Sequence, residues 1–152
     1  MYPSRHLIFG IFFSLILFYF FPQIGVIGFF LIIASTFFVD ADHYLFYVVQ
    51  KKDFRLKNAY KWFVEQMKKR LSLPKSERTK YKYEILICHG VEFWIVLALL
   101  SFFHVYFFYL FVGVIFHMFL DLLALTYYEF PLYVKLSQLY NFAKDRDKKD
   151  LL

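Results

Sequence analysis

The chain lacks a second cysteine, so Cys88 cannot form a disulfide within it, and the sequence carries no sign of an oxidising compartment. The long apolar stretches contain no lysine or arginine. No motif for reading nucleic-acid bases accompanies the basic residues that do occur. We therefore expect these cations to act as topological and solubilising charges, and we expect no nucleic-acid partner.

Apolar residues, by contrast, are abundant: 61% of the 152 residues are hydrophobic and 25% are aromatic, against about 45–50% apolar in a soluble domain. They gather in three blocks, 7–21, 24–39 and 85–125. As a single helix the last block would reach about 60 Å, twice the thickness of a hydrocarbon core, so it has to turn back, near 101–106. The sequence predicts an all-α integral membrane protein with four transmembrane helices, at about 4–21, 24–48, 85–103 and 106–126.

The first two predicted helices are short for full spans, because a span needs about 20 apolar residues. Flanking aromatic residues can supply the missing length, and a hairpin that does not fully cross the bilayer is the alternative. The first block resembles a signal sequence with Arg5 ahead of its apolar core, but it has no small-x-small cleavage site. We expect it to be a retained anchor.

The basic residues indicate the orientation. All 18 Lys and Arg lie in three places: Arg5, twelve between Lys51 and Lys82, and five from Lys135 onward. With four spans these places share one side of the membrane, which the positive-inside rule assigns to the cytoplasm. We expect a multi-pass protein of the plasma membrane with both termini in the cytoplasm.

The cytoplasmic parts have a pattern of their own. Residues 54–71 alternate apolar and basic positions at helical spacing, which predicts a basic amphipathic surface helix that binds anionic lipid headgroups. Residues 132–143 predict a second, weaker surface helix. We therefore divide the chain into a transmembrane domain, 1–130, which includes the basic connection 50–84, and a charged cytoplasmic tail, 131–152.

Seven ionisable side chains interrupt the apolar blocks near their cytoplasmic ends. At 1.5 Å per residue they fall within one or two helical turns of the same depth, although they come from three predicted helices. Within each predicted helix they recur at a spacing of three or four residues and so share a face, except for one that points away on a regular helix. They are Asp40, Asp42, His43, His89, Glu92, His117 and Asp121, and the exception is Asp42.

Their charges favour a metal centre. Four carboxylates with three neutral imidazoles carry −4, and no cation in the apolar blocks offsets them. Two divalent ions would bring this charge to zero, and we expect the site to hold one or two. Mixed imidazole and carboxylate ligands suit Zn²⁺, Mn²⁺ or Fe²⁺. All seven are candidate ligands, and Asp42 or Glu92 is alternatively a general base. We expect His6 to contact headgroups, His104 to lie at the interface and Cys88 to pack in the core.

Three motifs in this order resemble the YdjM-like family of predicted membrane-bound metal-dependent hydrolases of prokaryotes. They are DADH at 40–43, HGVE at 89–92 and GVIFHMFLD at 113–121. The chain departs from the family pattern at Val39, where members often have proline. It also has CHGVEFW in place of a central HR…TH signature, which puts Glu92 where a histidine is expected. The resemblance implies a hydrolase with a metal held by these residues.

A metal-dependent hydrolase acting on a phospholipid or a lipid-linked phosphate ester is therefore the first hypothesis, because the polar groups lie close to the headgroups. A small ion-coupled or proton-coupled transporter is the second, since intramembrane Asp, Glu and His also mark ion pathways. It requires polar groups at several depths, and the outer half of the predicted bundle has few. A non-enzymatic membrane scaffold is the third.

Overall fold

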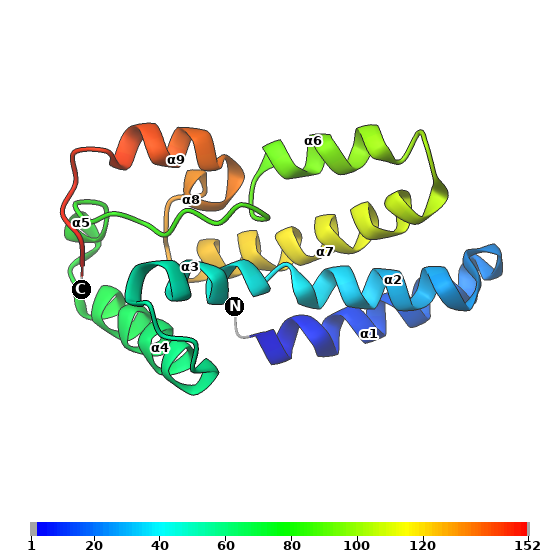
Figure 1. Cartoon of the computed structure of the whole chain (residues 1–152), viewed down its shortest axis with the longest axis horizontal. Helices are drawn as coiled ribbons and strands as arrows, with labels where there is room; N and C mark the ends of the chain where they lie inside the picture. Colours follow the sequence, from blue (N-terminus) through cyan, green and yellow to red (C-terminus); the bar gives the residue numbers. More distant parts are fainter. Residues whose placement is uncertain (1–2, 152) are drawn as a thin grey trace.

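The computed structural model describes residues 3–151, all of whose regular elements are helices. A hairpin of α1 (Pro3–Phe20) and α2 (Gly25–Phe38), joined through the short helix η1 (Pro22–Ile24), packs against α7 (Val105–Tyr127), with α2 between the other two (Figure 1). The chain continues the line of α2 as α3 (Ala41–Lys51).

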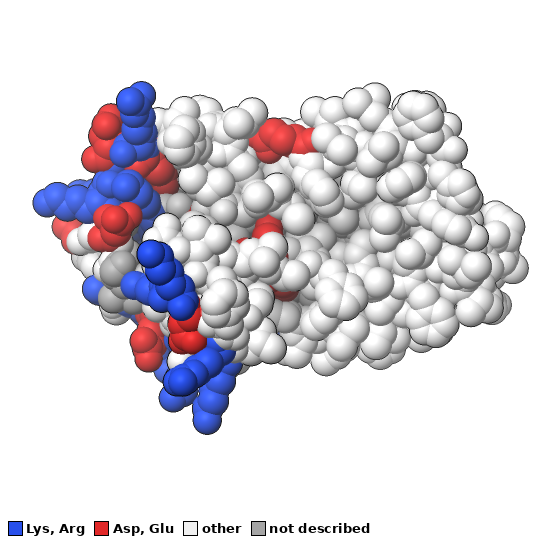
Figure 2. All heavy atoms as spheres, viewed as in Figure 1, with Lys and Arg blue, Asp and Glu red and all other residues white. Residues whose placement is uncertain are grey.

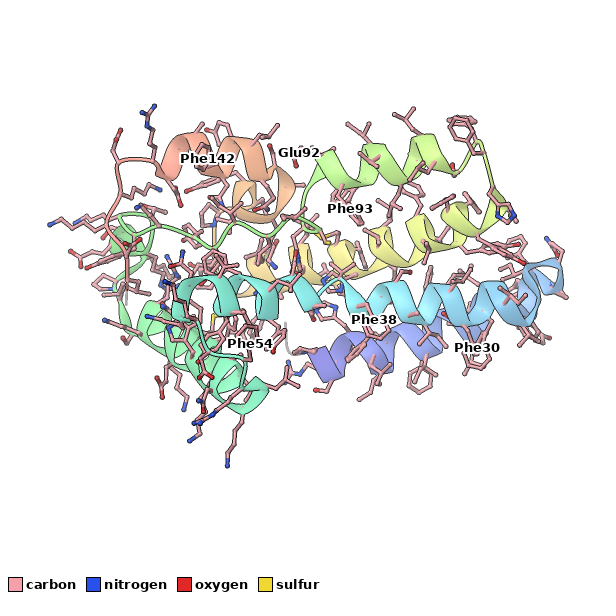
Figure 3. The ribbon with its side chains drawn as sticks, viewed as in Figure 1. Phe30, Phe38, Phe54, Glu92, Phe93 and Phe142 are labelled. Atoms are coloured by element: carbon pink, nitrogen blue, oxygen red, sulfur yellow. The ribbon has the colours of Figure 1, made fainter. Side chains whose placement is uncertain are left out.

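Three helical segments are long and apolar enough to cross a membrane: Pro3–Phe20, Pro22–Lys51 and Val105–Tyr127. Large apolar side chains on them face outward, among them Phe30 and Phe38 on α2, both more than 60% exposed (Figure 3). Outward-facing rings on long apolar helices are typical of a lipid-exposed surface. The composition of the chain and its shape therefore agree on a membrane protein.

The fourth expected span is not confirmed. In place of a helix over 85–103, the structure has an irregular segment up to Gly90 and then α6 (Val91–Leu100). Ten residues extend about 15 Å, half of a hydrocarbon core. The helix is apolar and packs on α7, but it is too short to span a bilayer by itself.

The segments outside the long apolar helices form one end of the molecule, where lysine and arginine gather (Figure 2). A helix does form at Leu56–Ser72 (α4), close to the expected 54–71, and its placement on a lipid surface stays a prediction. The remaining short helices are α5 (Lys75–Arg78), α8 (Tyr133–Leu136) and α9 (Gln138–Asp145). Two of the cations are structural, because the buried Arg70 donates to the carbonyl of Lys82 and Arg78 donates to that of Tyr128.

The expected charged tail is not a free one. The backbone of Lys149 pairs with residues 81–82, and Asp145 accepts a hydrogen bond from the backbone N–H of Tyr83 at 2.7 Å. Burial raises the pKa of the Tyr83 phenol to about 12, so this ring stays neutral. The C-terminal segment thereby runs back along residues 81–92 and holds them against the bundle.

The helical segment made of α2 and α3 breaks at the DADH motif. Asp42 N–H donates to the carbonyl of Val39 and His43 N–H donates to that of Asp40, three residues back instead of four. A stretch of 3₁₀ hydrogen bonding inside a helix often marks a hinge or a functional position. The break changes the directions of the side chains, so that Asp40 and Asp42 both face inward and both are buried.

Helices α2 and α7 approach closely where Gly113 leaves room. A Cβ at this position would overlap the carbonyl oxygen of Ile32 and the hydroxyl of Ser35. The hydroxyl of Thr36 donates to the carbonyl of Gly113 at 3.2 Å across the same contact. Small residues commonly allow such approaches in membrane helices, where packing replaces the hydrophobic effect.

Gly113→Ala should therefore force α2 and α7 apart, because the backbone oxygen of Ile32 cannot move aside. We expect a loss of about 1–3 kcal/mol in stability, measured as a lower midpoint of thermal unfolding in detergent. Val26→Ile also adds a methyl group, but to a side chain of α2 that is 64% exposed, and serves as the matched control. Equal midpoints for the two variants would contradict the packing described here.

Candidate metal centre

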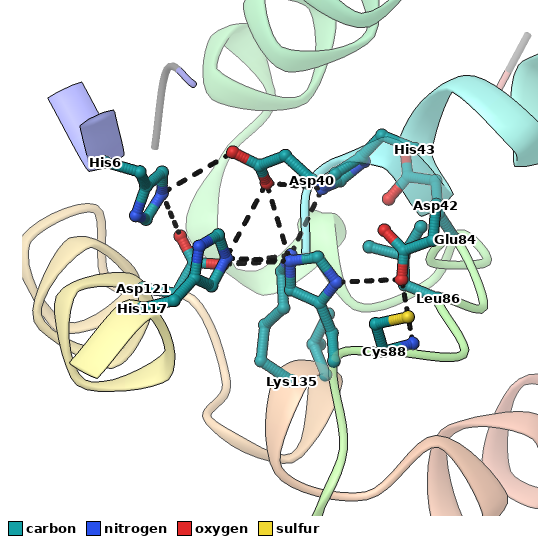
Figure 4. A network of polar contacts seen from close by, with 12 residues as sticks. His6, Asp40, Asp42, His43, Glu84, Leu86, Cys88, His117, Asp121 and Lys135 are labelled. Carbon is teal, nitrogen blue, oxygen red and sulfur yellow. Dashed lines mark hydrogen bonds and ion pairs between the residues drawn. The ribbon is translucent and has the colours of Figure 1, made fainter. Parts of the chain in front are cut away.

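Four side chains from three parts of the chain meet inside the bundle, with little or no exposure (Figure 4). They are Asp40, His89, His117 and Asp121. The two imidazole Nε2 atoms lie 3.1 Å apart. Oδ1 of Asp40 lies 3.6 and 3.7 Å from these nitrogens, and Oδ2 of Asp121 lies 3.5 and 3.6 Å from them.

These five separations, each of which joins an imidazole nitrogen to the other nitrogen or to a carboxylate oxygen, agree with the spacing of a tetrahedral metal site. Ligand atoms with bonds of about 2.0–2.1 Å to a tetrahedral ion lie about 3.3–3.4 Å from one another. The observed separations of 3.1–3.7 Å bracket that value. We call these four residues the tetrahedral set. His89, His117 and Asp121 have a spacing that could hold a metal ion, and Asp40 belongs to two further groups of this kind, one with His117 and one with His89.

The two imidazoles of the tetrahedral set are oriented by their other nitrogens. Nδ1 of His117 lies 2.7 Å from the carbonyl oxygen of Thr36, and Nδ1 of His89 lies 3.0 Å from Oδ2 of Asp42. Each Nδ1 carries the proton in this contact, because both partners are acceptors. Metal-binding histidines are held in this way, and the arrangement directs both Nε2 atoms at the same point.

Asp42 therefore lies behind His89, on the side of its Nδ1, and not on the side where the two Nε2 atoms meet. Its Oδ2 also accepts the backbone N–H of Cys88 at 2.9 Å, which fixes the carboxylate in place. On a regular helix Asp42 would point away from Asp40 and His43. Here the helix is irregular at this point, and the side chain of Asp42 contacts His89. In this arrangement Asp42 acts as a positioning residue for His89, and its role as a ligand or general base stays a prediction.

His6 belongs to the cluster, which corrects the expectation that it contacts headgroups. It is fully buried, its ring stacks on that of His117 at 3.9 Å between centroids, and its Nε2 lies 3.3 Å from Oδ1 of Asp121. With Asp40 and His117 it forms another group with metal-binding spacing. The depth argument could have found it, because it lies in the first turn of α1, at the end of the bundle that carries the other polar groups.

Lys135 is the second residue that sequence reasoning missed. It comes from α8, outside the apolar blocks, and its Nζ lies 3.1 Å from Oδ2 of Asp121 and 3.3 Å from Nε2 of His43. No Lys or Arg within the apolar blocks pairs with the carboxylates, as the sequence shows, but this lysine from outside the blocks does. Counted over residues 3–151, three buried aspartates, Asp40, Asp42 and Asp121, and the ammonium of Lys135 carry a formal charge of −2 with neutral imidazoles, the charge that one divalent ion balances.

The carboxylates act strongly on His89. Burial and the charge of Lys135 lower the pKa of this imidazole. Its contacts with Asp121, Asp40 and Asp42 raise the pKa by more, to about 9. The cluster therefore attracts a proton to a fully buried ring, and a metal ion would satisfy the same negative potential. At Cys88, burial and then Asp42 raise the pKa of the thiol to about 11, in keeping with a packing role.

Glu92 does not join the cluster. Its carboxylate accepts hydrogen bonds from the hydroxyl of Ser137 at 2.6 Å and from the backbone N–H groups of Gln138 and Leu139 at 3.2 Å each. It thus caps the N-terminus of α9 and links it to α6 (Figure 3). The structure gives Glu92 this structural role in place of the expected ligand or general base.

The C-terminal segment also positions His89. The side-chain amide of Gln138 donates to the carbonyl of His89 at 2.6 Å and accepts the backbone N–H of Leu86 at 3.0 Å. His89 lies in a turn before α6, and not on a helix face with Glu92 as expected. Its position is set by these contacts from α9 as well as by Asp42.

Two other histidines differ in location. His43 lies at the edge of the cluster, where its Nε2 is 3.7 Å from Oδ1 of Asp40 and its side chain is 28% exposed. His104 caps the N-terminus of α7, where its Nδ1 accepts the backbone N–H of Tyr106 at 3.2 Å. His43 therefore remains a candidate metal ligand or proton-transfer group, and His104 does not.

Asp42→Asn should weaken metal binding although the residue touches no ion. The amide is a poorer acceptor for His89 and does not stabilise the same tautomer, so we expect a loss of roughly 10–100-fold in affinity. Titration of the metal-free protein with Zn²⁺ against a chelator of known affinity measures this. An unchanged affinity would show that His89 does not depend on Asp42.

Glu92→Gln should leave zinc affinity unchanged within twofold and destabilise the protein by about 1 kcal/mol, because it weakens charge-assisted bonds at the start of α9. The same titration and a thermal unfolding curve measure both quantities. Loss of zinc with intact stability would return Glu92 to the list of ligands.

Comparison with protein-family models, with curated proteins and with solved structures finds no match for this chain. The resemblance to the YdjM-like family therefore rests on the three short motifs. The structure adds that one residue from each motif, His89, His117 or Asp40, reaches the same point.

Proposed function

We propose that this protein is a membrane-embedded metal-dependent hydrolase of the YdjM-like type, with one ion held by the tetrahedral set. The observation that carries the proposal is the convergence of two Nε2 atoms and two carboxylate oxygens at tetrahedral spacing in a buried site. Zinc or manganese fits this mixture of ligands. His6 lies beside the second oxygens of Asp40 and Asp121, and these three would be the start of a site for a second ion.

A bound divalent ion supplies Lewis-acid chemistry: it makes water a usable nucleophile at neutral pH and stabilises the negative charge that develops on the substrate. The residues of this chain provide the rest. Asp42 and Thr36 keep the lone pairs of the two ligand imidazoles directed inward. We assign the general base to His43, the partly exposed imidazole at the edge of the cluster, because proton transfer needs a group that both water and substrate can reach. Its Nε2 accepts from Lys135 in this structure, so this contact has to open before His43 takes a proton.

The location suggests the substrate. The cluster lies where α2 ends and α7 approaches its cytoplasmic end, next to the part of the surface that carries the basic residues. An ester linkage just below a lipid headgroup lies at such a level. A phospholipid or a lipid-linked phosphate ester is therefore the substrate class that we propose, with anionic headgroups also contacting α4.

The transporter hypothesis predicts polar groups distributed through the thickness of the bundle. The buried ionisable groups of the spanning helices within 3–151 instead gather at one level, at His6, Asp40, Asp42, His117 and Asp121. This distribution favours a single reaction site over a pathway.

His117→Ala should abolish both stoichiometric metal binding and hydrolysis, because it removes the ligand that the carbonyl of Thr36 orients. Elemental analysis of the detergent-purified protein measures the first, and release of free phosphate or headgroup from a panel of phospholipids measures the second. Glu92→Gln is the control that should keep both. Wild-type protein without bound transition metal, or metal that survives in His117→Ala, would refute the proposal.

A further inference from the structure

The most exposed side of the cluster is formed by Lys135 and His43. Their side chains are 12% and 28% exposed, whereas those of Asp40 and Asp121 are 7% or less and the rings of His6, His89 and His117 are fully buried. A molecule that approaches the tetrahedral set from this side meets Lys135 and His43 before the candidate metal ligands. The lysine is therefore placed between the candidate metal ligands and the outside.

The ammonium has spare hydrogen-bonding capacity. It carries three N–H donors, and two of them are used, one by Oδ2 of Asp121 at 3.1 Å and one by Nε2 of His43 at 3.3 Å. Among residues 3–151 no third acceptor contacts it. A third donor is free for an oxygen atom of a ligand.

The position of Lys135 is held by neighbouring structure. It follows α7 after a short loop, and α8 is fixed to α9 through the bond from Gln138 to the carbonyl of Val134 at 3.0 Å. A cation kept in place beside a carboxylate that is itself a candidate ligand serves the metal poorly, because two positive charges repel one another at this range. The same pair of positive charges attracts an anion strongly.

We propose that Lys135 forms the anion-binding subsite of this centre and, with the metal ion, binds the phosphoryl group of a phosphate ester. The proposal deepens the proposed function and rests on it. The residue is not a metal ligand: it takes one non-bridging phosphoryl oxygen through its third N–H, while Asp121 and His43 hold the ammonium in place.

The geometry gives two opposite effects for one substitution. Lys135→Met keeps the apolar stem and removes the charge, so Mn²⁺ should bind more tightly, on the order of tenfold, because a nearby repelling charge is gone. Inorganic phosphate should bind the Mn²⁺-loaded protein more weakly, on the order of tenfold or more, because a charge-assisted hydrogen bond is lost. Lys135→Arg should retain phosphate binding.

Both effects are measured on the full chain in detergent. Electron paramagnetic resonance of free Mn²⁺ gives the metal affinity, and broadening of the phosphate ³¹P signal by bound Mn²⁺ gives the anion affinity. Lys80→Met removes the same charge from a side chain that is 65% exposed and pairs only with Glu77, so it should change neither value. Repeating the phosphate titration with short-chain phosphatidic acid distinguishes a lipid phosphate, which should then bind more tightly, from a free one.

The outcomes separate the two proposals. Wild-type protein that binds no Mn²⁺, Zn²⁺ or Fe²⁺ overturns the metal centre and the subsite with it. Metal binding with phosphate affinity unchanged in Lys135→Met overturns the subsite alone. Loss of both metal and phosphate in that variant would make Lys135 a structural counter-ion and would also overturn the subsite.

Discussion

Two carboxylates, those of Asp40 and Asp121, lie buried in a bundle whose other contacts are mostly apolar, and such groups are stable there only beside positive charge or protons. The surrounding structure supplies both. Lys135 reaches Asp121 from outside the spanning helices, and the imidazoles of His89 and His117 lie against both carboxylates. The need of these two aspartates for cations explains why parts of the chain far apart in sequence meet at one point.

The helices make this meeting possible by close packing and by one interruption. Gly113 lets α7 approach α2 so that His117 reaches the carbonyl of Thr36. The break after Val39 turns Asp40 and Asp42 inward together, which a regular helix would not allow. The backbone thus determines the directions of the candidate ligands. The packing of apolar surfaces lowers the local dielectric constant, which strengthens the electrostatic interactions between the charged groups.

Much of this arrangement could be predicted from hydropathy and depth, since apolar length and polar spacing are local properties. Asp40, His89, His117 and Asp121 could be grouped because each sits near the same end of an apolar block. The place of Lys135 could not, because it depends on how the C-terminal segment folds back. The separation of Glu92 from the cluster could not be predicted for a related reason: its i,i+3 spacing from His89 implies a shared face only in a helix, and the helix begins after His89.

The central claim is that one ion is held by two imidazole nitrogens and two carboxylate oxygens. X-ray absorption spectroscopy at the zinc edge of the zinc-loaded, detergent-purified protein tests it most directly. The account predicts four nitrogen or oxygen neighbours at about 2.0–2.1 Å, with the outer-shell signal of two imidazoles. A sulfur neighbour at about 2.3 Å, which only Cys88 or a methionine could supply, or a spectrum without imidazole scattering would contradict it.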